Sequence, residues 1–86
     1  MSEKVEYLRE EERSAALTTA KLFLTTPDVA AQENNVFTET DRSGRRHIVY
    51  LGNEHGFRCF VGSYPTPSKA QMISAFVKTL VEPVSV

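Results

Sequence analysis

Residues 47–64 read HIVYLGNEHGFRCFVGSY, and no other part of the chain is as well suited to pair with itself. Two runs of β-branched and aromatic residues flank the polar segment GNEHG. Such runs around a short polar connection are typical of a β-hairpin, and Gly56 can adopt the left-handed conformation that the connection requires. The pattern predicts strands at residues 46–51 and 57–63, and these two strands form the centre of the fold.

The two predicted strands carry large apolar side chains on both of their faces. Because side chains alternate along a strand, His47, Val49 and Leu51 belong to one face. The opposite face is predicted to hold Ile48, Tyr50, Phe60 and Tyr64. Helices that cover one face of the sheet leave the other face exposed, and an exposed apolar patch on a small domain is typical of a contact surface.

The rest of the chain predicts two helices and one further strand. Apolar residues at helical spacing predict one helix over residues 3–25. They predict a second helix that starts at Ser68, in a capping box with Gln71, and ends before Pro83. Residues 36–41 predict an edge strand with a thin apolar face. This order predicts an α+β fold of two layers, with a three-stranded antiparallel meander flanked by an N-terminal and a C-terminal helix (α-β-β-β-α), both on one face.

The 86 residues predict a single small domain, because a chain of this length builds only one modest core. The net charge is −1, with acidic residues concentrated near the N-terminus and arginines between residues 42 and 58. A nucleic-acid-binding protein typically has a larger basic excess. There is no apolar run long enough to span a bilayer, no apolar secretory signal and only one cysteine, so we expect a cytoplasmic protein without membrane contact.

His47, His55 and Cys59 are the residues that first suggest a metal site or a nucleophile. If Val49 faces Cys59 across the hairpin, His47 and Cys59 are diagonal neighbours on one face. Zinc needs about four ligands, and a Cys–His nucleophile needs an orienting group and an oxyanion hole. The chain has none of these patterns and no glycine-rich phosphate loop. We therefore predict no catalytic residue, no metal site and no cofactor, and a protein that is not an enzyme.

Two short motifs suggest a nucleic-acid-binding alternative. Residues 44–47, Gly-Arg-Arg-His, are similar to the Gly-Pro-x-His loop of double-stranded-RNA-binding domains, and Ser68-Lys69 is similar to the start of their last helix. The α-β-β-β-α order also resembles this family, which recognises A-form RNA by its shape. The resemblance implies contacts from Arg45, Arg46, His47 and Lys69. The chain lacks the loop proline and the lysine cluster of the family's last helix, and its first helix is acidic.

The preferred hypothesis is a small protein–protein interaction module, acting as an adaptor, an inhibitor or a regulatory subunit. Its partner is a protein, and a homodimer through the sheet is one form that this hypothesis includes. The predicted partner-binding residues are Ile48, Tyr50, Phe60 and Tyr64 on the apolar face and Arg42, Arg45, Arg46 and Arg58 beside it. Aromatic residues and arginine are the types enriched at interface centres. Binding of duplex RNA is the alternative, and a small-molecule pocket between helices and sheet is the third hypothesis.

Overall fold

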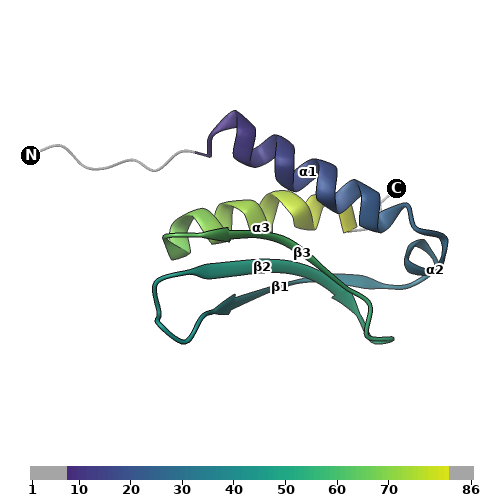
Figure 1. Ribbon diagram of the computed structural model, residues 1–86. Helices are drawn as coiled ribbons and strands as arrows, with labels where there is room; N and C mark the ends of the chain where they lie inside the picture. The colour runs from purple at the N-terminus through teal and green to yellow at the C-terminus, as the bar shows by residue number, and fades with distance from the viewer. Residues whose placement is uncertain (1–7, 82–86) are drawn as a thin grey trace, which may run out of the picture.

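The computed structural model describes residues 8–81, which form two layers (Figure 1). One layer is an antiparallel sheet with the strand order β1-β2-β3. The elements are α1 (Glu10–Leu24), α2 (Pro27–Ala30), β1 (Asn34–Thr40), β2 (His47–Asn53), β3 (Arg58–Tyr64) and α3 (Pro67–Val81). The predicted α+β fold, a three-stranded meander flanked by an N-terminal and a C-terminal helix, is confirmed, and the one-turn helix α2 lies between α1 and β1.

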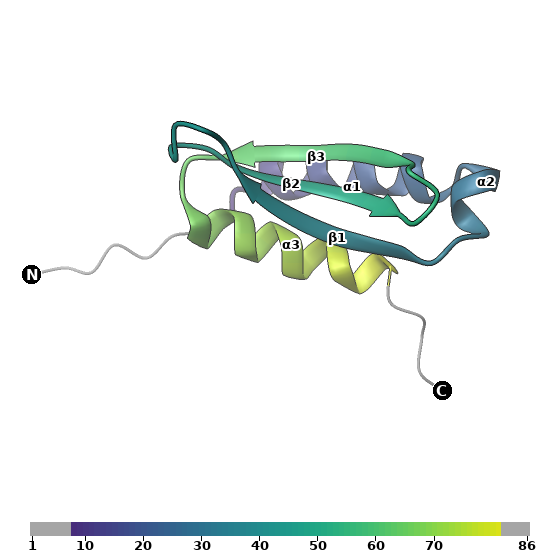
Figure 2. The same ribbon diagram turned by 90° about the horizontal axis from the view of Figure 1, so that it is seen from below.

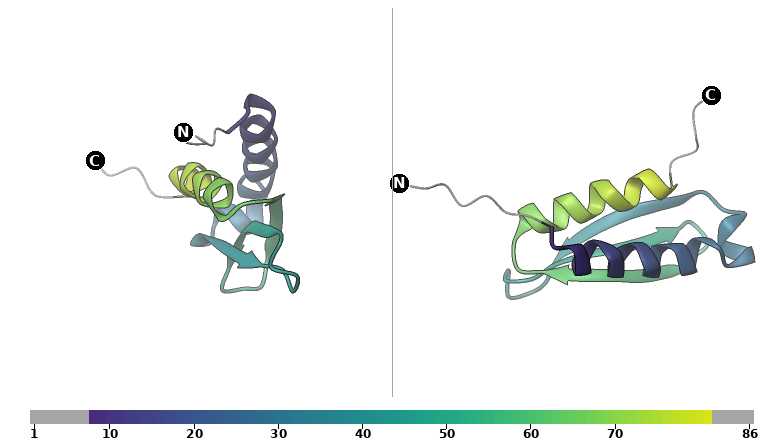
Figure 3. Two further views of the ribbon diagram at one scale, coloured as in Figure 1. Left: turned by 90° about the vertical axis from the view of Figure 1, so that its left-hand side faces the viewer. Right: turned by 90° about the horizontal axis from the view of Figure 1, so that it is seen from above.

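Both long helices pack on the same face of the sheet (Figure 3). The helix α1 lies against β3, and α3 lies mainly against β1 and β2. Seen from below, the strands lie in front of α1, and no element within residues 8–81 covers this side of the sheet (Figure 2). The sheet therefore has one covered face and one open face.

The covered face holds the core. The helix α1 contributes Ala16 and Ala20, whose small side chains let the helix approach the strands closely. The other core residues are Val49, Leu51, Val61, Tyr64, Ala70, Ile73 and Val77. Leu22 is different, because it lies on the outer side of α1 and is 69% exposed. The core thus depends on the apolar stripe of α3 and on one face of the central strand β2.

The β2–β3 hairpin pairs in a different register from the predicted one. The observed pairs are Leu51–Cys59, Tyr50–Phe60, Val49–Gly62, Ile48–Ser63 and His47–Tyr64. The predicted pairing of Val49 with Cys59 is therefore wrong. Phe57 belongs to the connection, where its carbonyl oxygen accepts the N–H of Asn53 at 3.2 Å. Between Phe60 and Gly62 a β-bulge makes Val61 an extra residue of β3. An alternating sequence pattern does not reveal such an extra residue.

This bulge moves Tyr64 to the covered face. In a regular strand Tyr64 would share a face with Phe60, but one extra residue reverses the alternation beyond it. Tyr64 is only 6% exposed and packs in the core. The prediction that it belongs to the exposed partner-binding face is therefore wrong. Burial raises the pKa of Tyr64, and the nearby charge of Glu12 raises it further.

The helix α1 begins at Glu10, with Arg9 as its N-cap. The N–H of Arg9 donates to Oε1 of Glu12 at 3.1 Å, which satisfies one donor at the start of the helix. The predicted start at residue 3 lies outside the described residues, but the prediction also placed Leu8 and Arg9 in the helix, which is wrong because Arg9 has the extended backbone of an N-cap. Glu12 also pairs with Lys69 of α3 at 3.2 Å, with 22% and 20% of the two side chains exposed. This ion pair ties the first turn of α1 to the first turn of α3.

The helix α3 begins at Pro67, one residue before the predicted N-cap. The hydroxyl of Thr66 accepts the N–H of Lys69 at 3.2 Å, and the Thr66 carbonyl accepts the N–H of Ala70 at 3.3 Å. Thr66 therefore caps the helix, and the predicted cap at Ser68 is wrong. The predicted end before Pro83 lies outside the described residues.

Candidate interaction surface

One aromatic side chain from each strand lies in a single row across the open face. Phe37 of β1 pairs with Tyr50 of β2, and Tyr50 pairs with Phe60 of β3. Side chains paired directly across antiparallel strands point to the same face. Phe37 is 47% exposed and Phe60 is 61% exposed, whereas Tyr50 between them is half-buried. We call Phe37, Tyr50 and Phe60 the aromatic row.

Gly52 allows one end of this row to lie close to the backbone of β2. A Cβ atom at Gly52 would lie 3.3 Å from Cε2 of Phe37 and 3.2 Å from the carbonyl oxygen of Phe57. The same Cβ would lie 3.6 Å from Cγ of Arg58, so two side chains cover this glycine. Phe37 is not among the predicted contact residues. No pattern in the sequence marks it, because only the β1–β2 register places Phe37 beside Tyr50.

Two groups of opposite charge flank Ile48, which is the residue of β2 next to Tyr50 on the open face. Glu39 of β1 pairs with Ile48, which pairs with Ser63 of β3. The hydroxyl of Tyr50 donates a hydrogen bond to Oε2 of Glu39. On the other side, Nε of Arg46 donates to Oγ of Ser63 at 2.9 Å and Nη2 donates to the Ser63 carbonyl oxygen at 2.7 Å. A carboxylate therefore lies at β1 and a guanidinium at β3.

The β1–β2 turn is ordered by Asp41. Its Oδ1 accepts the Ser43 hydroxyl at 2.7 Å and the N–H groups of Arg45 and Arg46 at 3.2 and 3.3 Å. These bonds, that of Ser43 most of all, lower the pKa of Asp41. Gly44 has a φ of +74°, which glycine adopts without strain. The turn thus presents Arg45 from a fixed backbone.

The predicted partner-binding residues are divided by the structure. Ile48, Tyr50, Phe60 and Arg46 lie together on the open face. Arg58 lies on the same face but at the opposite end of the sheet, beside Gly52. Arg42 and Arg45 are exposed in the turn beyond the strand ends. Tyr64 is in the core.

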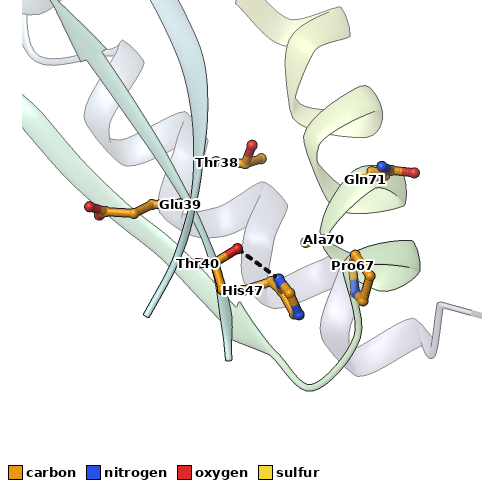
Figure 4. A pocket seen from close by; sticks show the side chains of 7 residues that line it. All are labelled: Thr38, Glu39, Thr40, His47, Pro67, Ala70 and Gln71. Carbon is orange, nitrogen blue, oxygen red and sulfur yellow. Dashed lines mark hydrogen bonds between the residues drawn. The ribbon is translucent and has the colours of Figure 1, made fainter. Parts of the chain in front are cut away.

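A small pocket lies between β1 and the start of α3, on the covered side of the sheet (Figure 4). Its volume is about 220 Å³. Oγ1 of Thr40 and Nδ1 of His47 lie 3.2 Å apart at its wall. Glu39 borders the pocket, but its side chain points away from α3 in Figure 4. None of the aromatic row lines this pocket.

His47 and Cys59 are not brought together. Cys59 pairs with Leu51 and His47 pairs with Tyr64, which places them at opposite ends of the hairpin. The prediction of diagonal neighbours is therefore wrong. Burial raises the pKa of Cys59, which disfavours the thiolate that a nucleophile requires. Within residues 8–81, no three His, Cys, Asp or Glu side chains gather as metal ligands would.

The residues implied by the resemblance to double-stranded-RNA-binding domains do not share one face. Lys69 pairs with Glu12 in the helix layer. His47 borders the pocket on the covered side, near the start of α3. Arg46 instead lies on the open face, where Ser63 holds its guanidinium.

Comparison of the chain with known protein families, with curated proteins and with solved structures gives no match. In the part of the chain that the structure describes, no helix has the length and apolar character needed to cross a membrane. Function is therefore inferred from the geometry of the open face itself.

Proposed function

We propose that this protein is a non-enzymatic protein–protein interaction module that binds its partner with the open face of the sheet. The observation that carries the proposal is the aromatic row, in which Phe37 and Phe60 are about half exposed. Large aromatic side chains bury about 150–250 Å² each, and burial of apolar surface stabilises by about 25 cal/mol per Å². A partner that covers the row buries this exposed apolar surface, and the burial contributes to the affinity of the complex.

The surroundings of the row also suit a protein interface. Such interfaces have an apolar, aromatic centre and a polar rim, and arginine is enriched in them. Here Arg46 and Arg58 lie at the two ends of the face, and Glu39 lies at its β1 edge. Hydrogen bonds to Ser63 and Tyr50 hold two of these groups in place, so little side-chain entropy is lost when a partner binds.

A small module of this kind acts by binding, as an adaptor, an inhibitor or a regulatory subunit. The single cysteine of the chain, Cys59, is free and half-buried. A protein with one unpaired cysteine suits a reducing compartment, so we place the function in the cytoplasm.

Affinity capture with a matched control tests this function. The variant Phe37→Ser/Phe60→Ser removes the exposed aromatic row, and Leu22→Ser removes an exposed apolar side chain from the helix side. Immobilised wild-type protein is expected to retain specific proteins, this chain included, from nuclease-treated lysate. The double variant should lose them and Leu22→Ser should keep them, with circular dichroism showing that all three are folded.

Two results would overturn the proposal. One is an identical set of retained proteins for the wild type and both variants. The other is retention that is found with untreated lysate and is absent with nuclease-treated lysate, because the partner would then be a nucleic acid.

A further inference from the structure

We propose that the partner of the open face is a second copy of this chain, packed face to face about a two-fold axis parallel to β2. This inference rests on the proposed function, because it needs the open face to be a protein contact surface. It adds the identity of the partner and the symmetry of the complex. Most soluble homodimers have such two-fold symmetry, in which the same surface patch serves both subunits.

The positions of the charged groups support this axis. Glu39 on β1 and the Arg46 guanidinium over β3 lie on either side of Ile48, at the same height along the strands. A two-fold axis parallel to β2 exchanges the β1 side and the β3 side without changing the height. Glu39 of each copy then meets Arg46 of the other copy. The contact occurs twice, and the open face is complementary to itself.

The same axis matches the aromatic rows. It places Phe37 of one copy against Phe60 of the other, and it places the two Tyr50 rings against each other at the axis. Face-to-face sheets lie about 10 Å apart, a gap that large side chains from both sheets fill. The remaining exposed surface of Phe37 and Phe60 is then buried in aromatic pairs.

The far end of the sheet agrees with this arrangement. Asn35, Gly52 and Arg58 share one height on β1, β2 and β3. The proposed axis brings Asn35 of one copy to Arg58 of the other, and the asparagine carbonyl oxygen can accept from the guanidinium.

The alternative is a two-fold axis that also lies between the two sheets but runs perpendicular to the strands. This axis would bring like charges together. It reverses the height and keeps each strand opposite its own copy. The guanidinium of Arg46, which lies over one end of β3, would then meet Arg58 of the other copy, and two arginines would face each other twice. Like charges placed opposite each other in an interface are unfavourable. The charges therefore select the axis parallel to β2.

Sedimentation over a concentration series, with reversal of each charge, tests the complex. We expect the wild type to be a dimer. Glu39→Arg and Arg46→Glu each place like charges together at both symmetric contacts, so each should weaken the dimer by about tenfold or more. The double variant Glu39→Arg/Arg46→Glu restores opposite charges and should recover dimerisation.

Two further variants keep the test independent of folding. Glu11→Arg makes the same charge change on the exposed side of α1 and should leave the dimer unchanged. Phe60→Ser leaves the Ser63 and Tyr50 hydrogen bonds in place and should give a monomer. Thermal unfolding monitored by circular dichroism shows which variants are folded.

The dimer is overturned if the wild type sediments as a monomer up to millimolar concentration. It is also overturned if a dimer persists unchanged in Glu39→Arg, Arg46→Glu and Phe60→Ser. A monomeric wild type that still captures another protein through the aromatic row would refute the second copy and leave the proposed function standing. Variants of the row that change neither assay would refute both.

Discussion

The absence of a side chain at Gly62 leaves the space that the ring of Tyr64 occupies. A Cβ atom at Gly62 would lie 2.7 Å from Cζ of Tyr64 and closer still to its hydroxyl oxygen. The Tyr64 ring cannot easily move away, because it is buried. We expect Gly62→Ala to lower the free energy of unfolding by about 1–3 kcal/mol, the usual cost of overpacking. Urea unfolding of the purified variant measures this change.

A double-mutant cycle identifies the cause of this loss. Tyr64→Phe removes the hydroxyl oxygen that lies nearest to the added carbon. Gly62→Ala should therefore cost less in the Tyr64→Phe background than in the wild type. An equal cost in both backgrounds would show that the contact with Tyr64 is not the reason.

Glu12 couples the stability of the two helices to pH. The Arg9 N–H, and to a smaller extent Lys69, lower the pKa of Glu12 below its ordinary 4.5. A carboxyl with a lowered pKa in the folded state stabilises the fold above its unfolded pKa, and this contribution is lost as pH falls through the folded pKa. We expect Glu12→Gln to cost less than about 1 kcal/mol near pH 7, because both partners are partly exposed.

The pH dependence of the Glu12→Gln effect is the sharper test. The wild type should lose its advantage over the variant as the pH falls below about 4.5, since both then carry an uncharged group at this position. Urea unfolding at about pH 7 and about pH 3 measures the difference. A difference of the same size at both values would mean that ionisation of Glu12 contributes nothing.

At the scale of the elements, the stability of α3 depends on the residue that caps its N-terminus. Thr66 lies before Pro67, which disfavours helical geometry at Thr66 and favours the extended geometry of an N-cap. We expect Thr66→Ala to lower the free energy of unfolding by about 1 kcal/mol, the usual cost of losing a cap. Ser68→Ala is the matched control and should change it by less than about 0.5 kcal/mol. Thermal unfolding of both variants checks this, and a larger loss for Ser68→Ala would contradict the observed cap.

Local sequence patterns predict the ranges of the strands but not the register of the hairpin. The predicted ranges 36–41, 46–51 and 57–63 agree within two residues with β1, β2 and β3. Runs of β-branched and aromatic residues and the glycines that end them are local signals, so they can be read from the sequence. The register of the hairpin depends on the connection and on the bulge at Val61, and packing in the folded state decides both.

The same reasoning explains which parts of the open face could be predicted. Ile48 and Tyr50 lie on the regular central strand, where alternation gives the face correctly. Phe60 precedes the bulge and Tyr64 follows it, so alternation holds for the first and fails for the second. Phe37 joins the row only through the β1–β2 register, which the sequence does not reveal.

At the scale of the whole molecule, the chain has more large apolar side chains than its one core contains. A chain of 86 residues builds a single modest core, and here both long helices pack on one face of the sheet. The aromatic row lies on the other face and is not part of this core. Exposed apolar faces promote association, so a face of this kind is either covered by a specific partner or a source of aggregation.

The dimer proposed for this face makes stability depend on concentration. A partner that binds only the folded chain stabilises it by mass action, so the Tm of the wild type should rise with protein concentration. Phe60→Ser should remove this dependence, because Phe60 lies in the proposed contact and outside the core. Leu22→Ser should keep the dependence, since Leu22 lies on the helix side. Scanning calorimetry over a range of concentrations measures all three, and a constant wild-type Tm would contradict self-association.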